Sequence, residues 1–125
     1  MGEEECFVYV FKNTKTNNVK VGITNNIINR LRALNRDNPE IEFYLGNKNL
    51  PLYFWSGVKA YKTKNYTEVE KLAHKNLKNY EDTDSPIGEV FSCIIEIAIQ
   101  AIEDALKDLN LFDEATVFEE SQLYN

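Results

Sequence analysis

Two apolar runs separated by a polar segment open the chain. Residues 7–11 read Phe-Val-Tyr-Val-Phe, and Val19, Val21 and Ile23 alternate with lysine and glycine. A period of two is typical of a half-buried β-strand. The Asn- and Thr-rich segment 13–18 between the two runs is typical of a turn. The pattern therefore predicts that the chain begins with a β-hairpin.

Helical spacing replaces this alternation further along the chain. Apolar residues recur every three or four positions over about residues 26–35, after polar residues suited to cap a helix, and Pro39 follows the end of this pattern. Similar apolar faces predict a second helix over about residues 67–79 and a third over about residues 92–109.

The remaining apolar segments predict strands. Residues 52–61 are expected to form a third strand with a bulge at Gly57, and residues 41–45 alternate like a short edge strand. Val90 and Phe91 form only a short apolar stop. The resulting order is strand, strand, helix, strand, helix, helix, without obvious parallel crossovers. It predicts an α+β fold with a small, central, mostly antiparallel three-stranded sheet flanked by helices.

Composition fits one small domain with a hydrophobic core, since hydrophobic residues make up 43% of the 125 positions. We expect the domain to span residues 1–109 and residues 110–125 to form an acidic C-terminal tail or an extra helix. The most apolar stretch, 93–106, is interrupted by polar residues, and the acidic N-terminus does not resemble a secretory signal. Cys6 and Cys93 are expected to be buried free thiols in a reducing compartment, which is cytoplasmic, or nuclear in a eukaryote.

Charge is unevenly distributed along the chain. The net charge of −6 argues at first against a nucleic acid partner. However, residues 1–80 hold 13 basic and 8 acidic residues, a net +5, whereas residues 81–125 hold 1 basic and 12 acidic residues, a net −11. A basic surface attracts phosphate locally even on an acidic molecule. The alternative is that the acidic residues only form a solvated surface.

Five polar residues could carry chemistry. The predicted hairpin brings Tyr9 and Lys20 close together if they share a face, and Arg30 lies on the helix that follows. Glu70 and His74 are four residues apart, so they share one face of the second helix and could supply a metal ligand and a proton-transfer group. Each residue also has a structural explanation, as an exposed strand residue, a solvated arginine or a stabilising helix pair.

Together these residues form a series of motifs in a fixed order. The motifs are Phe7-Val8-Tyr9, Lys20-Val21-Gly22, the helical segment 27–34 containing Arg30, the helical segment 70–74, and Gly88-Glu89-Val90-Phe91. Over about residues 6–106 this series resembles the GIY-YIG nuclease superfamily, in particular its branch of T5orf172 and MUG113-like domains. The chain departs from the superfamily pattern at three motif positions. Phe7 replaces a glycine, Lys20 replaces a tyrosine, as is usual in this branch, and Val90 replaces a tryptophan.

The resemblance implies an endonuclease that uses Mg²⁺ or Mn²⁺ to hydrolyse phosphodiester bonds. It implies that Glu70 binds the metal and that Arg30 stabilises charge on the phosphoryl oxygens. Tyr9 would position or deprotonate the attacking water, which requires a lowered pKa. Lys20 would hold the phosphate or the water, and His74 would relay a proton or contact phosphate.

Other residues would support this site. Gly22 permits close approach of backbone or ligand, and Glu89 is expected to cap or to form a salt bridge. The expected partner is nucleic acid, DNA in the first place, whose backbone phosphates attract cationic side chains without sequence choice. The candidate phosphate contacts are Arg32, Arg36, Lys62, Lys64, Lys71 and Lys75.

Three other functions are compatible with the sequence. The first is a nucleic-acid-binding domain that kept the fold and lost catalysis. The second is a regulatory protein-interaction domain whose acidic residues 110–125 mimic nucleic acid or cover a basic face. The third is a hydrolase of another phosphoester. The oligomeric state is left open by the sequence.

Overall fold

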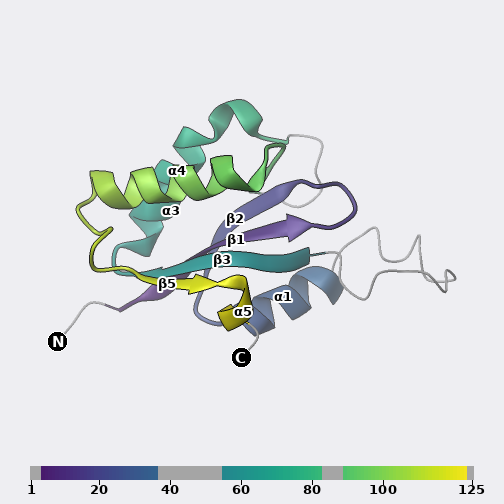
Figure 1. The fold of residues 1–125 in the computed structure, drawn as a ribbon, viewed down its shortest axis with the longest axis horizontal. Helices are drawn as coiled ribbons and strands as arrows, with labels where there is room; N and C mark the ends of the chain where they lie inside the picture. Colours follow the sequence, from purple (N-terminus) through teal and green to yellow (C-terminus); the bar gives the residue numbers. More distant parts are fainter. Residues whose placement is uncertain (1–3, 37–54, 83–88, 124–125) are drawn as a thin grey trace, which may run out of the picture.

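The computed structural model describes residues 4–36, 55–82 and 89–123, and within these ranges five strands form one open sheet in the order β4-β2-β1-β3-β5 (Figure 1). The strands are β1 (Cys6–Asn13), β2 (Val19–Thr24), β3 (Trp55–Thr63), β4 (Val90–Phe91) and β5 (Thr116–Glu119). Each neighbouring pair is antiparallel. The predicted α+β class and antiparallel pairing are confirmed, but the predicted count of three strands is wrong.

The two additional strands are the short edges of the sheet. β4 has two residues, Val90 and Phe91, which pair with Lys20 and Val19. β5 pairs with residues 59–62 of β3. Segments of two and four residues are too short to show a period of two, so the sequence pattern could not distinguish them from loops.

Helices cover both faces of the sheet. Figure 1 shows α3 and α4 on one face and α1 and α5 on the other. Their bounds are α1 (Ile27–Arg36), α3 (Tyr66–Asn76), α4 (Ile95–Asp108) and α5 (Glu120–Leu123), with a 3₁₀ turn at Lys78–Tyr80. The second helix ends before residue 79 and the third starts after residue 92, because Leu77 and Ile94 leave the helical conformation. In the described ranges, no helix is long and apolar enough to cross a membrane.

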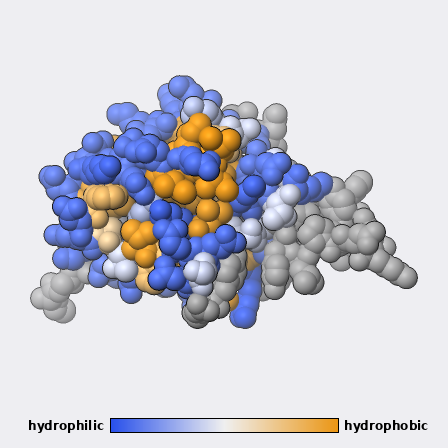
Figure 2. All heavy atoms as spheres, in the orientation of Figure 1, coloured by the Kyte–Doolittle hydropathy of each residue, from blue (hydrophilic) through white to orange (hydrophobic). Residues whose placement is uncertain are grey.

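The central strand β1 is buried on both faces and divides the core in two. Val8 and Val10 pack in the cluster beneath α3 and α4. Tyr9 and Phe11 point the other way and pack in a second cluster with α1 residues such as Leu31. Figure 2 shows a mostly hydrophilic surface with an apolar patch over α4. Full burial of such side chains stabilises a fold by about 1.5–3 kcal/mol each.

The register of the hairpin decides which residues share a face. Tyr9 lies opposite Gly22 and Phe11 lies opposite Lys20. Tyr9, Lys20 and Gly22 therefore project from the same face of the sheet, the one covered by α1. On the other side of β1, Val10 pairs with Lys59 and Phe11 with Gly57, so the extra residue of a bulge is next to the predicted glycine.

Some predictions concern segments that remain untested or lie outside the described residues. The expected strand over residues 41–45 and the start of the third strand at residues 52–54 fall outside them. The domain division at residue 109 stays a prediction, although the segment that follows contributes β5 to the sheet and Leu123 to the second core cluster. Cys6 and Cys93 are free thiols, the first buried and the second half-buried.

Candidate nuclease site

The candidate site lies at the outer edge of β2, beyond the point where β4 ends. β4 pairs with Val19 and Lys20, so among the described residues the backbone of Val21 has no strand partner on that side. Its N–H donates to the carbonyl oxygen of Glu89 at 3.3 Å. Its carbonyl oxygen lies 2.7 Å from Nε2 of His74. The His74 side chain of α3 thus provides a hydrogen-bond partner for the backbone at the edge of β2 and fixes α3 against this strand.

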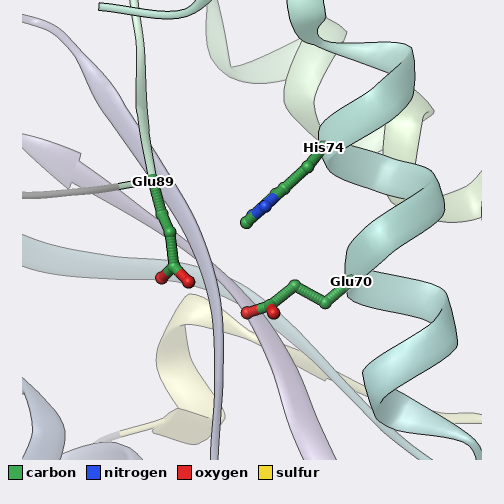
Figure 3. A group of neighbouring side chains, drawn as sticks. All are labelled: Glu70, His74 and Glu89. Carbon is green, nitrogen blue, oxygen red and sulfur yellow. The ribbon is translucent and has the colours of Figure 1, made fainter. Parts of the chain in front are cut away.

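Three ionisable side chains converge at this edge. Glu70, His74 and Glu89 each place a potential ligand atom within 4.8 Å of the other two. Figure 3 shows the carboxylates of Glu70 and Glu89 approaching each other beside the imidazole of His74. Glu70 and His74 are one turn apart on α3, whereas Glu89 precedes β4. Glu89 has a φ of 66°, a left-handed conformation that costs a non-glycine residue about 1–2 kcal/mol.

On the α1 face of the sheet, Tyr9 is fixed between its neighbours. Its side chain is 1% exposed and stacks on Phe11 with ring centroids 3.8 Å apart. Nε of Arg30 donates a hydrogen bond to the Tyr9 hydroxyl at 3.4 Å. A Cβ at Gly22 would lie 2.5 Å from Oη and 2.7 Å from Cζ of Tyr9. Gly22 has no positive φ, so glycine is required here to make space for the phenol.

Lys20 is an internal cation of the site. It is only 2% exposed, and its Nζ donates to Oε2 of Glu89 at 2.9 Å. Burial lowers the pKa of Lys20, while the hydrogen bond and charge of Glu89 act in the opposite direction. Arg30 and Glu70 are also close enough to affect this pKa. The Lys20–Glu89 pair therefore connects the α1 face of the sheet to the cluster at its edge.

The prediction of a lowered pKa for Tyr9 is wrong. Burial raises the pKa of Tyr9 to about 12, and this effect outweighs the opposing hydrogen bond and charge of Arg30. Tyr9 is therefore a neutral phenol at physiological pH. Since Oη accepts a hydrogen bond from Arg30, its own proton is available for donation.

Glu70 has the properties of a ligand for a divalent cation. Its Oε2 is buried and has no hydrogen-bond partner among the described residues. Burial, and then the charge of Glu89, raise the pKa of Glu70. Mg²⁺ and Mn²⁺ prefer carboxylate oxygens and relieve the repulsion between neighbouring carboxylates. The side chains at this position thus fit the cation that the sequence resemblance implied.

The T5orf172 domain model matches residues 6–109. The chain belongs to the T5orf172 family. This family is related to GIY-YIG-like nucleases, and membership indicates a nuclease-like or nucleic-acid-binding domain. No curated protein and no solved structure matches the chain.

The predicted phosphate contacts of this T5orf172 domain are distributed over several elements. Arg32 is exposed on α1, where Arg36 is the last residue, and Lys75 is exposed on α3. Lys71, also exposed on α3, lies 3.8 Å from Glu68.

The two candidates of β3 lie farther from the edge of β2. Lys62 lies over the ring of Phe7 at 5.7 Å from its centroid, and the half-buried Lys64 follows β3. The sheet order places two strand spacings between β3 and β2. Of the six candidates, only Arg32 and Arg36 on α1 and Lys71 and Lys75 on α3 lie on the helices that carry Arg30 and Glu70.

Sequence reasoning underestimated Glu89 in this T5orf172 domain. Its contacts with Lys20, Val21 and the ligand cluster all depend on the pairing of β4 with β2. The motif Gly88-Glu89-Val90-Phe91 marked the position, but Val90 and Phe91 were interpreted as an apolar stop. Recognising them as an edge strand would have placed Glu89 beside Lys20.

Proposed function

We propose that this T5orf172 domain is a metal-dependent endonuclease that hydrolyses nucleic acid phosphodiester bonds, with DNA as the expected substrate. The proposal rests on the buried carboxylate oxygen of Glu70, which has no hydrogen-bond partner within the described ranges and lies beside the cationic groups of the site. A purely structural carboxylate would be expected to use that oxygen in a hydrogen bond. Nucleic acid hydrolysis requires both a bound cation and fixed positive charges around the phosphate.

Different side chains of the site meet different requirements of phosphodiester hydrolysis. Glu70 would hold Mg²⁺ or Mn²⁺, which polarises a phosphoryl oxygen and increases the acidity of a bound water. Arg30 uses Nε to bind Tyr9, and its terminal nitrogens can stabilise charge on the phosphoryl oxygens. The buried ammonium of Lys20, held by Glu89, adds a second fixed positive charge.

Tyr9 acts through position and hydrogen bonding in this proposal. Because its pKa is raised to about 12, its hydroxyl orients a water or a phosphoryl oxygen by donating a proton in a hydrogen bond. The stack on Phe11 and the space left by Gly22 define where that hydroxyl lies. This fixed geometry reduces the reorganisation that the reaction requires.

A plasmid-cleavage assay with purified protein in Mg²⁺ or Mn²⁺ tests the proposal. Wild type should nick or cut DNA, and Glu70→Gln and Arg30→Ala should each reduce the rate by about 10²-fold or more. Glu68→Gln removes a carboxylate from the exposed surface of the same helix and should leave the rate unchanged. Cleavage that survives in both site variants would show that another site, or a contaminant, is responsible.

A nucleic-acid-binding domain without catalysis is the second candidate. The observation that favours it is the raised pKa of Tyr9, since a phenol with a pKa of about 12 is not a ready base at neutral pH. A gel-shift assay at low salt separates the two candidates. DNA binding without cleavage in every divalent metal tested would favour this second function.

A further inference from the structure

We propose that Glu70, His74 and Glu89 together form one divalent-cation site with an imidazole ligand, which makes the protein prefer Mn²⁺ to Mg²⁺. The inference deepens the proposed function, because the same cation would serve hydrolysis, and it assigns His74 to the metal instead of to proton relay. It depends on the tautomer of His74, the converging carboxylates and the ligand preferences of the two ions.

The hydrogen bond to Val21 fixes the tautomer of His74. A backbone carbonyl oxygen can only accept, so the 2.7 Å contact requires a proton on Nε2. In the neutral ring the lone pair then belongs to Nδ1. Metal-binding histidines commonly donate their other N–H to a backbone carbonyl in this way. The ring also packs against Phe91, with centroids 5.2 Å apart, which restricts its orientation.

The two carboxylates reach the same place from different segments. Glu70 is one helical turn before His74, and its buried Oε2 has no partner among the described residues. Glu89 arrives from the residue before β4, and its Oε2 binds Lys20. Neighbouring ligands of an octahedral ion are about 3 Å apart when the bonds are about 2.1 Å long. Because one ring nitrogen of His74 and one carboxylate oxygen of each glutamate lie within 4.8 Å of one another, small side-chain rotations would bring Nδ1 and the two carboxylates onto one ion.

The composition of the site determines which ion it favours. Mg²⁺ prefers oxygen ligands and retains much of its water, so an imidazole contributes little to its binding. First-row transition ions accept imidazole nitrogen, and their affinities increase from Mn²⁺ to Cu²⁺ and then fall at Zn²⁺. Glu89 is 41% exposed, so water can complete the coordination shell from that side. We therefore expect Mn²⁺ to bind at least about 10-fold more tightly than Mg²⁺.

Titration calorimetry with each ion, in the absence of nucleic acid, tests the ligand set. His74→Gln keeps an N–H that can reach the Val21 carbonyl but replaces the ring nitrogen with an oxygen ligand. It should reduce the Mn²⁺ to Mg²⁺ affinity ratio about 10-fold. Glu89→Gln should weaken the binding of both ions, and Glu68→Gln is a surface control on α3 that should change neither affinity. An unchanged ratio in His74→Gln, or unchanged affinities in Glu89→Gln, would overturn the proposal.

Nuclear magnetic resonance of the unmodified protein provides a test that does not depend on the folding of a variant. His74 is the only histidine in the sequence, so its ring nitrogens need no further assignment. We expect the Nε2–H tautomer without metal, and a shift of Nδ1 with retention of the Nε2 proton when Zn²⁺ is added. A protonated Nδ1 in the metal-free protein, or ring nitrogens insensitive to Zn²⁺, would contradict the assignment.

The two proposals can fail separately. Protein that binds Mn²⁺ through all three residues but cleaves no nucleic acid would overturn the endonuclease and support the cation site. Protein that cleaves DNA while His74→Gln keeps the wild-type ion preference would overturn this cation site and support the endonuclease.

Discussion

Replacing Gly22 with alanine tests the central steric relation of the site. The added Cβ would lie 2.5 Å from Oη and 2.7 Å from Cζ of Tyr9, and 3.2 Å from Oε2 of Glu89. The first two separations are shorter than any van der Waals contact, so the phenol or the strand must move. Tyr9 has little room to do so, because it is 1% exposed and stacks on Phe11.

The sign of the stability change distinguishes this steric role from a simple backbone effect. Alanine in the interior of a strand is favoured over glycine by about 0.5–1 kcal/mol, because it loses less conformational entropy on folding. Overpacking a close-packed site costs about 1–3 kcal/mol. The net expectation is that Gly22→Ala lowers the free energy of unfolding by about 1–2 kcal/mol. It should also reduce cleavage by about 10²-fold, since displacements of about 1 Å at a reacting centre have effects of that size.

Urea denaturation of a double-mutant cycle with Tyr9→Leu measures the contact directly. Leucine lacks both the Oη and the Cζ that the new methyl group would meet. In the Tyr9→Leu background, Gly22→Ala should be neutral or stabilising, giving a coupling free energy of about 1–3 kcal/mol. An alanine that stabilises the wild-type protein, or that costs as much in the Tyr9→Leu background as in the wild-type protein, would refute this interpretation.

Three further changes test other parts of the structure. In chelator, Glu70→Gln should raise the melting temperature by removing the charge on a buried oxygen that has no hydrogen-bond partner in the described part of the chain, a cost of about 1 kcal/mol. Thermal denaturation with Glu68→Gln as the control measures this change. In an ultraviolet titration, the tyrosinate absorbance that the wild type shows and Tyr9→Phe lacks should develop only near pH 12. Development of this absorbance near pH 10 would contradict the burial argument. Tyr61→Phe should cost about 1.5–3 kcal/mol in urea denaturation, because the buried hydroxyl donates a 2.5 Å bond to Glu103, and an unchanged denaturation midpoint would argue against that bond.

Local patterns were enough to predict the hairpin and the three main helices. Alternation over β1 and β2 and helical spacing in α1, α3 and α4 each identify an element without tertiary information. The i, i+4 spacing of Glu70 and His74 also predicted that they share a helix face, and both do reach one cluster. Whether Tyr9 and Lys20 share a face of the sheet depends on the hairpin register, which the sequence pattern did not determine.

Features that depend on long-range pairing were not predictable. The Val21 carbonyl is available to His74 only because β4 ends at the position of Lys20, and a two-residue strand has no sequence pattern of its own. The pKa of Tyr9 was predicted in the wrong direction because the sequence suggested a neighbouring lysine and a metal but not the depth of burial. Burial by residues of other elements is the larger effect.

The edge of β2 is where side chains from both faces of the sheet can meet. Tyr9 belongs to the core on the α1 face and Arg30 is carried by α1, whereas Glu70 and His74 are carried by α3 on the opposite face. Inside the sheet the strands separate these two groups. At an edge that β4 covers for only two residues, Glu89 can bind Lys20 from one face while approaching Glu70 from the other. A longer β4 would pair the Val21 backbone with a strand and displace the His74 contact, so the short edge strand is a requirement of the site's geometry.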